Sequence, residues 1–157
     1  MKRQLLIILM SLLLFGLYGC GDSDRPAESA ENKEILSIES DYNILLINTY
    51  LKNIQDASDG FYNEYFTISP RADYYVVSVK EISSDHSTNP TSLITFICEP
   101  FVGPHYPVGT DKISFSADYS GNIELEEFKH IKSYSLPDNL KSLIKKPIPG
   151  EYEPFDE

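Results

Sequence analysis

Two histidines and one aspartate surround an unusual loop in the second half of the chain. The loop covers residues 101–110 and contains His105, and Asp111 follows it directly. If Tyr119 pairs with Ile123 across the turn at 120–122, His130 falls opposite Lys112, or one residue away if the strand has a bulge, and therefore beside Asp111. Imidazole and carboxylate groups placed together could bind a metal ion or form an acid–base pair. His105, Asp111 and His130 are therefore the candidate functional residues.

The same three residues have a structural interpretation, which we favour. The loop contains two glycines and two prolines, so its backbone follows an unusual path that needs an anchor. His130 or Asp111 could supply that anchor by hydrogen bonding to the loop. Two histidines without tight ligand spacing are weak evidence for a metal site, and the sequence has no phosphate-binding glycine loop, nucleophile elbow or paired-histidine zinc motif. The sequence therefore predicts no catalytic residue, no metal and no cofactor.

The start of the chain predicts export and a lipid anchor. Two basic residues precede an apolar run over residues 5–18, which is the order of a secretory signal peptide, and a spanning helix would need ~20 apolar residues. Gly19-Cys20 ends this run and resembles the lipobox of bacterial lipoproteins, where a diacylglyceryl group is attached to the cysteine. We therefore predict a signal peptide at 1–19 and lipidation of Cys20. Two acyl chains would hold the protein stably on the extracytoplasmic face of the cell membrane.

The composition of the chain limits its partners. Its 157 residues carry a formal net charge of −11, and removal of the basic signal peptide makes the mature chain more acidic still. This charge argues against nucleic acid as a partner and against adhesion to anionic lipid, so the membrane contact rests on the lipid anchor. Cys98 is the one remaining cysteine, which excludes an internal disulfide, and its apolar surroundings predict a small buried core residue.

The chain after the signal peptide divides into three predicted parts. Residues 20–36 contain the lipidated cysteine and a polar, acidic stretch that predicts a flexible tether. Residues 37–136 carry the apolar patterns of one folded domain. Residues 137–157 predict a Pro-rich acidic tail, with a helical turn around 139–145 and a loose end.

One amphipathic helix and four strands are predicted in the domain. The helix should begin at Ser40, bend or break near Gly60, and end before Ser69. The strands are predicted at residues 74–82, 92–99, 112–119 and 123–134. A slip in the alternation of the last strand predicts a bulge near Glu126-Glu127. The prediction is an α+β fold, in which an N-terminal amphipathic helix packs on a four-stranded antiparallel meander, similar to cystatin-like or nuclear-transport-factor-like proteins.

Two segments, FVGPHYPVGTDKISF and FKHIKSYSLP, resemble an uncharacterised family of short secreted proteins from spore-forming Gram-positive bacteria, whose domain is of unknown function. The resemblance covers about residues 44–137. It implies one domain, export and a special status for His105 and His130, and it brings no known activity or cofactor. This chain differs in its lipobox and its longer acidic tether and tail. A host with a single membrane would place the lipid on the outer leaflet.

These observations predict a membrane-anchored extracytoplasmic lipoprotein that acts as a non-catalytic binding module. Its partners would be the membrane, through the lipid, and a peptide, protein or small ligand in the envelope. The alternative is an envelope metal-binding protein or hydrolase that uses His105, Asp111 and His130. Three polar groups that converge in one pocket would favour the alternative, and an apolar or tyrosine-rich concave face would favour the binding module.

Overall fold

The computed structural model describes residues 27–150 and 152–153, with side chains from residue 39 onwards within these ranges. The predicted signal peptide at 1–19 and the lipidation site Cys20 lie outside the described residues. None of the described helices is long and apolar enough to span a membrane. The chain divides into two compact units, Met1–Glu39 and Ser40–Glu157. Both apolar core clusters lie in the second unit, so a chain that begins at residue 21 keeps both.

The helix α2 spans Ala27–Tyr62. It begins earlier than the predicted start at Ser40, within the region predicted as a tether, and it ends earlier than the predicted end before Ser69. Gly60 lies inside the last turn and does not interrupt the helix. Of the two predicted alternatives, a bent helix and a broken one, the break is wrong, since α2 continues through Gly60 to Tyr62.

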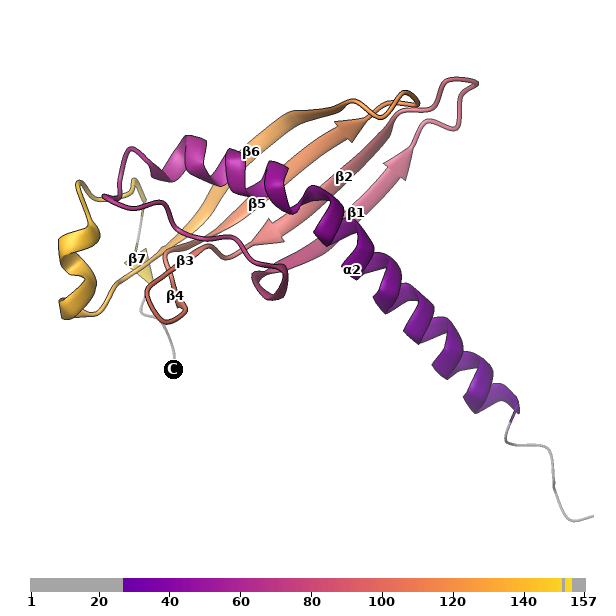
Figure 1. The fold of residues 1–157 in the computed structure, drawn as a ribbon, viewed down its shortest axis with the longest axis horizontal. Coiled ribbons are helices and arrows are strands. Elements are labelled where there is room, and N and C mark those ends of the chain that lie inside the picture. Colours follow the sequence, from indigo (N-terminus) through magenta and orange to yellow (C-terminus); the bar gives the residue numbers. More distant parts are fainter. Residues whose placement is uncertain (1–26, 151, 154–157) are drawn as a thin grey trace, which may run out of the picture. The chain divides into compact units, whose positions relative to one another are not determined.

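One five-stranded sheet forms the centre of the domain, in the order β1-β2-β5-β6-β7 (Figure 1). Its strands are β1 Val77–Ser84, β2 Ser92–Cys98, β5 Gly109–Ala117, β6 Ile123–Tyr134 and β7 Tyr152–Glu153. The first four pair antiparallel, as predicted, and the α+β class is confirmed. The strand count was wrong, because β7 adds a fifth strand that is parallel to β6. A two-residue strand is too short to show an alternation pattern in the sequence.

Four short elements complete the described fold. A 3₁₀-helix η1 (Tyr74–Val76) precedes β1, at the start of the predicted first strand. The strands β3 (Phe101–Val102) and β4 (Tyr106–Pro107) pair as a separate hairpin within the predicted loop. A second 3₁₀-helix, η2 (Asp138–Leu143), lies where the sequence predicts a helical turn. The predicted loose end is wrong at Tyr152–Glu153, because β7 pairs there with β6.

Two apolar clusters hold the unit together. The first lies where α2 crosses one face of the sheet (Figure 1), and it is built around Ile54, Phe96 and Phe115. The second lies at the end of α2 and contains Tyr62 together with Ile148, which comes from the predicted tail. The second cluster therefore joins the helix end, the hairpin loop and the segment after β6, and it surrounds the candidate site.

Two bulges interrupt the pairing of β5 with β6. Ser114 pairs with Glu127 and Phe115 with Leu125, so Glu126 is an extra residue, and the predicted bulge is confirmed. The second bulge was not predicted. Thr110 pairs with Lys132 and Asp111 with His130, which leaves Ile131 as the extra residue. This second bulge determines which side chains of β6 can meet.

Candidate functional site

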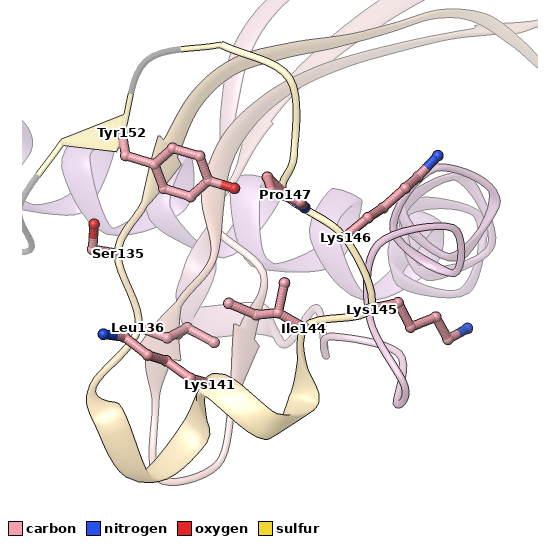
Figure 2. A pocket seen from close by; sticks show the side chains of 8 residues that line it. All are labelled: Ser135, Leu136, Lys141, Ile144, Lys145, Lys146, Pro147 and Tyr152. Atoms are coloured by element: carbon pink, nitrogen blue, oxygen red, sulfur yellow. The ribbon is translucent and has the colours of Figure 1, made fainter.

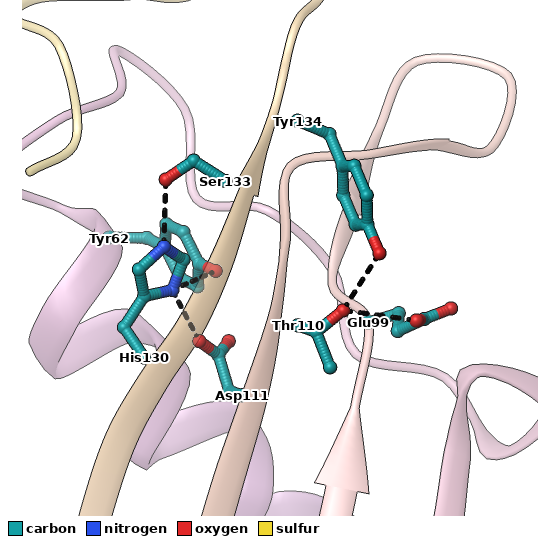
Figure 3. A network of polar contacts seen from close by, with 7 residues as sticks. All are labelled: Tyr62, Glu99, Thr110, Asp111, His130, Ser133 and Tyr134. Carbon is teal, nitrogen blue, oxygen red and sulfur yellow. Dashed lines mark hydrogen bonds and ion pairs between the residues drawn. The ribbon is translucent and has the colours of Figure 1, made fainter. Parts of the chain in front are cut away.

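Asp111 and His130 form a close pair between β5 and β6. They lie opposite each other in the strand register, and Asp111 Oδ1 is 2.7 Å from His130 Nδ1 (Figure 3). The Asp111 side chain is fully buried, and the His130 side chain is 12% exposed. The neighbourhood of the two residues agrees with the sequence prediction, but the predicted pairing of Tyr119 with Ile123 is wrong, because Ala117 pairs with Ile123.

Ser133 continues the arrangement on the other side of the imidazole. Its Oγ lies 2.8 Å from His130 Nε2, and Ser133 is 1% exposed (Figure 3). In a regular strand, residues three apart point to opposite faces. The extra residue Ile131 reverses that alternation and brings Ser133 to the face of His130. Sequence analysis missed Ser133 for this reason, because an even alternation would place it on the other face.

Two aromatic residues at the end of α2 fix the imidazole. The Phe61 ring stacks on the His130 ring, with centroids 5.0 Å apart and planes 25° apart. The Tyr62 ring meets it edge-on, and the Tyr62 hydroxyl lies 3.3 Å from Nδ1. Tyr62 is itself fully buried in the second cluster. The helix therefore holds the ring in one orientation, from which both nitrogens reach partners on the sheet.

Gly109 allows the base of the loop to approach the same ring. A Cβ at Gly109 would lie 2.5 Å from His130 Cε1, 2.5 Å from the Lys132 carbonyl oxygen and 2.7 Å from the Tyr62 hydroxyl. No side chain fits at such distances, so a glycine is required here for a steric reason rather than for a special φ. His130 thus packs against the base of the 101–110 loop, as the sequence predicts.

Burial dominates the electrostatics of the site. Desolvation raises the pKa of the Asp111 carboxyl above its ordinary value, although hydrogen bonds from His130 and Tyr62 and the charge of His130 act in the other direction. Asp111 Oδ2 is buried and has no hydrogen-bond partner within the described residues. Burial, followed by the charge of Asp111, also raises the pKa of Tyr62 and of Cys98, which pairs with Asp111 across the strands. Cys98 is fully buried, as predicted.

The order carboxylate, imidazole, hydroxyl is the arrangement that activates a serine nucleophile. A nucleophile must also reach its substrate, and the Ser133 hydroxyl is enclosed in this structure. A closed network of this kind stabilises one packing of its elements, because each buried polar group depends on the others. The geometry therefore supports a structural role, in which the network connects α2, the loop and β6, more strongly than it supports catalysis.

His105 lies in a different environment. Its backbone adopts a φ of 67°, its Nδ1 is 2.7 Å from the Tyr75 hydroxyl, and its ring packs 4.9 Å from the Phe101 ring. The contacts described for His105 are thus with Tyr75 and Phe101 rather than with Asp111 and His130. The β3–β4 hairpin turns the loop back on itself and directs His105 to these aromatic residues. No cluster of three metal-ligating side chains occurs among the described residues.

An open pocket of about 540 Å³ lies beyond the end of β6, between η2 and β7 (Figure 2). It is lined by three apolar residues, three lysines and two hydroxyl residues: Leu136, Ile144, Pro147, Lys141, Lys145, Lys146, Ser135 and Tyr152. All of them except Ser135 and Leu136 belong to the segment that the sequence analysis treated as a tail. Sequence analysis missed this pocket because no apolar periodicity marks the segment.

Residues 42–132 match a family described as proteins of unknown function, DUF3888. The chain belongs to the DUF3888 family. The match contains Tyr62, Asp111 and His130, and it ends immediately before Ser133. The pocket beyond β6 also lies outside the DUF3888 match. No curated protein and no solved structure matches the chain.

Proposed function

We propose that the protein is a membrane-anchored extracytoplasmic lipoprotein whose DUF3888 domain is a non-catalytic binding module, with its ligand site in the pocket between η2 and β7. The observation that carries this proposal is the contrast between two sites. The pocket is open, largely apolar and within the range of ~300–1,000 Å³ that is usual for small-ligand sites. The polar network around His130 is closed.

The architecture is compatible with this role. One helix crosses a sheet of mostly antiparallel strands, so we place the domain with cystatin-like or nuclear-transport-factor-like folds as part of the proposal. Such folds offer a concave face or an exposed loop for a ligand. Fold analogy alone does not identify a function, and the pocket is therefore the stronger support.

The anchor is tested by metabolic labelling with a clickable fatty acid. The proposal expects label on the wild-type chain and none on Cys20→Ala, because the predicted lipobox and apolar run direct acylation to that sulfur. Equal labelling of the two chains would reject the lipid anchor. Binding at the pocket is tested independently of it.

The pocket is tested with the neutral fluorescent probe phenylnaphthylamine, which brightens in apolar sites. A chain that begins at residue 21 should bind the probe, and Ile144→Trp should suppress the signal because the larger side chain occupies space against the apolar floor, where the probe would lie. Leu125→Trp is the matched control, since half-exposed Leu125 lines a separate cleft of about 220 Å³ against α2. Thermal unfolding should confirm that both variants are folded. A signal that survives Ile144→Trp, or that Leu125→Trp removes, would reject this site.

A second candidate function is a serine hydrolase, and one observation favours it: the linkage of Asp111, His130 and Ser133. Ser133 Oγ would attack an ester carbonyl while Nε2 takes its proton and later returns it to the leaving alcohol; water would then release the acyl group by the same route. A fluorophosphonate probe should then label the wild type and spare Ser133→Ala, while exposed Ser78→Ala should be labelled normally. Absence of wild-type labelling at neutral pH would reject the hydrolase.

A further inference from the structure

We infer that the pocket between η2 and β7 takes an amphiphilic carboxylate, with an apolar chain in the pocket and the anionic head at its lysine rim. This inference rests on the proposed binding function and deepens it by naming the class of ligand. It depends on three features of the wall, which are its apolar floor, its basic rim and its two hydroxyl groups.

The floor is apolar and continuous with the protein core. Leu136 is buried in the second cluster, and Ile144 packs against the same cluster. Pro147 closes the wall next to Ile144 (Figure 2). Burial of apolar ligand surface against these side chains favours binding. The body of the ligand is therefore a hydrocarbon or another apolar group.

The rim is basic in a protein whose net charge is −11. Lys141, Lys145 and Lys146 contribute their apolar stems to the wall, and their ammonium groups extend outward from it (Figure 2). Two of these ammonium groups pair with carboxylates, Lys141 with Asp138 and Lys146 with Glu64. Lys145 Nζ instead donates to the carbonyl oxygen of Asn63, so its positive charge is not neutralised by that partner.

The existing pairs do not exclude a ligand anion. Lys141 and Asp138 are 62% and 94% exposed, and exposed ion pairs contribute little to stability. A ligand carboxylate can therefore replace Asp138 at small cost, and it can approach Lys145 without displacing a charge. Lys145 is the residue on which the inference depends most.

Two hydroxyl groups complete the site for an oxyanion. Ser135 and Tyr152 line the wall, and in Figure 2 the Tyr152 hydroxyl points across the pocket toward Pro147. The Tyr152 oxygen accepts a hydrogen bond from the Ile148 amide at 2.7 Å, and this bond does not use the hydroxyl hydrogen, which can be donated to a ligand oxygen. A monoanion suits the site better than a dianionic phosphate, because the surrounding acidic chain repels the second charge.

The test is competition against phenylnaphthylamine by three ligands with the same apolar chain: dodecanoate, dodecanol and dodecyltrimethylammonium, each below its micelle-forming concentration. Dodecanoate should displace the probe at the lowest concentration, and added salt should weaken it. Lys145→Glu should weaken dodecanoate by about fivefold at low salt and leave dodecanol unchanged. Lys80→Glu is the matched control, because Lys80 is exposed on β1 and does not line the pocket.

The outcomes separate this inference from the proposed function. If dodecanol or the cationic ligand competes as well as dodecanoate, the carboxylate is the wrong class while the pocket remains a binding site. If the probe signal is insensitive to Ile144→Trp, the proposed site itself is wrong. Lys145→Gln is a milder variant that should also weaken dodecanoate. If both Lys145→Glu and Lys145→Gln keep the wild-type preference for dodecanoate over dodecanol, the inference is overturned.

Discussion

The substitution Gly109→Ala tests how closely the base of the loop packs against His130 and Tyr62. The added Cβ would meet His130 Cε1 and the Lys132 carbonyl oxygen at 2.5 Å and the Tyr62 hydroxyl at 2.7 Å. Overpacking typically costs ~1–3 kcal/mol. We expect the upper part of that range, because one neighbour is backbone of β6 and the other two are rings fixed by stacking and burial.

Gly60→Ala is the matched control for the same substitution in a different environment. Nothing lies within 4 Å of a Cβ at Gly60, which is inside the last turn of α2. Alanine is favoured over glycine in a helix by up to ~1 kcal/mol, so Gly60→Ala should stabilise the protein. The two identical substitutions should therefore change the unfolding free energy in opposite directions.

Urea unfolding, followed by far-UV circular dichroism, measures both variants. The expected result is a midpoint below the wild type for Gly109→Ala and above it for Gly60→Ala, with similar m-values. A Gly109→Ala variant within about 0.5 kcal/mol of the wild type would refute the close packing of loop base, imidazole and helix end.

Three further predictions follow from the same network. His130→Ala should cost about 1–3 kcal/mol in urea unfolding because it leaves buried partners unsatisfied, whereas His130→Gln should retain much of the stability; equal losses would contradict a hydrogen-bonding role. Cys98 should resist a water-soluble thiol reagent until the protein is denatured, since it is buried and burial raises the pKa of its thiol; rapid native labelling would show that the core assignment is wrong. Burial also raises the pKa of Asp111 in the folded chain, so its contribution to stability is fully present below the unfolded pKa and is lost as pH rises through the folded pKa. The unfolding free energy of the wild type relative to Asp111→Asn should therefore fall as pH rises from about 4. A rise would show that folding lowers the pKa of Asp111 instead of raising it.

The antiparallel part of the fold could be predicted because its strands are long enough to show alternation. The predicted bounds of the last strand, 123–134, agree with β6, and the slip near Glu126 corresponds to a bulge. The predicted register put His130 within a residue or so of Asp111, and the observed register with its bulge at Glu126 pairs the two directly. A strand pattern that extends over several residues thus determined both the sheet and the first contact of the candidate site.

The remaining features depend on tertiary contacts that leave no periodic signal. The bulge at Ile131 adds one residue to a strand end, and it alone brings Ser133 to His130. The strand β7 has two residues, and the pocket beside it is formed by 3₁₀ and irregular backbone. His105 was grouped with Asp111 because it is close in sequence, but the β3–β4 hairpin directs it to Tyr75.

An amide NMR titration with dodecanoate, on a chain that begins at residue 21, shows directly whether the pocket between η2 and β7 binds the ligand. We expect saturable shifts concentrated in residues 135–148 and 152, with little change around Tyr75 and His105. The Ile144→Trp chain should lose these shifts while its remaining spectrum stays dispersed. Shifts centred elsewhere, or none in a folded wild-type chain, would contradict a binding module whose ligand site is this pocket.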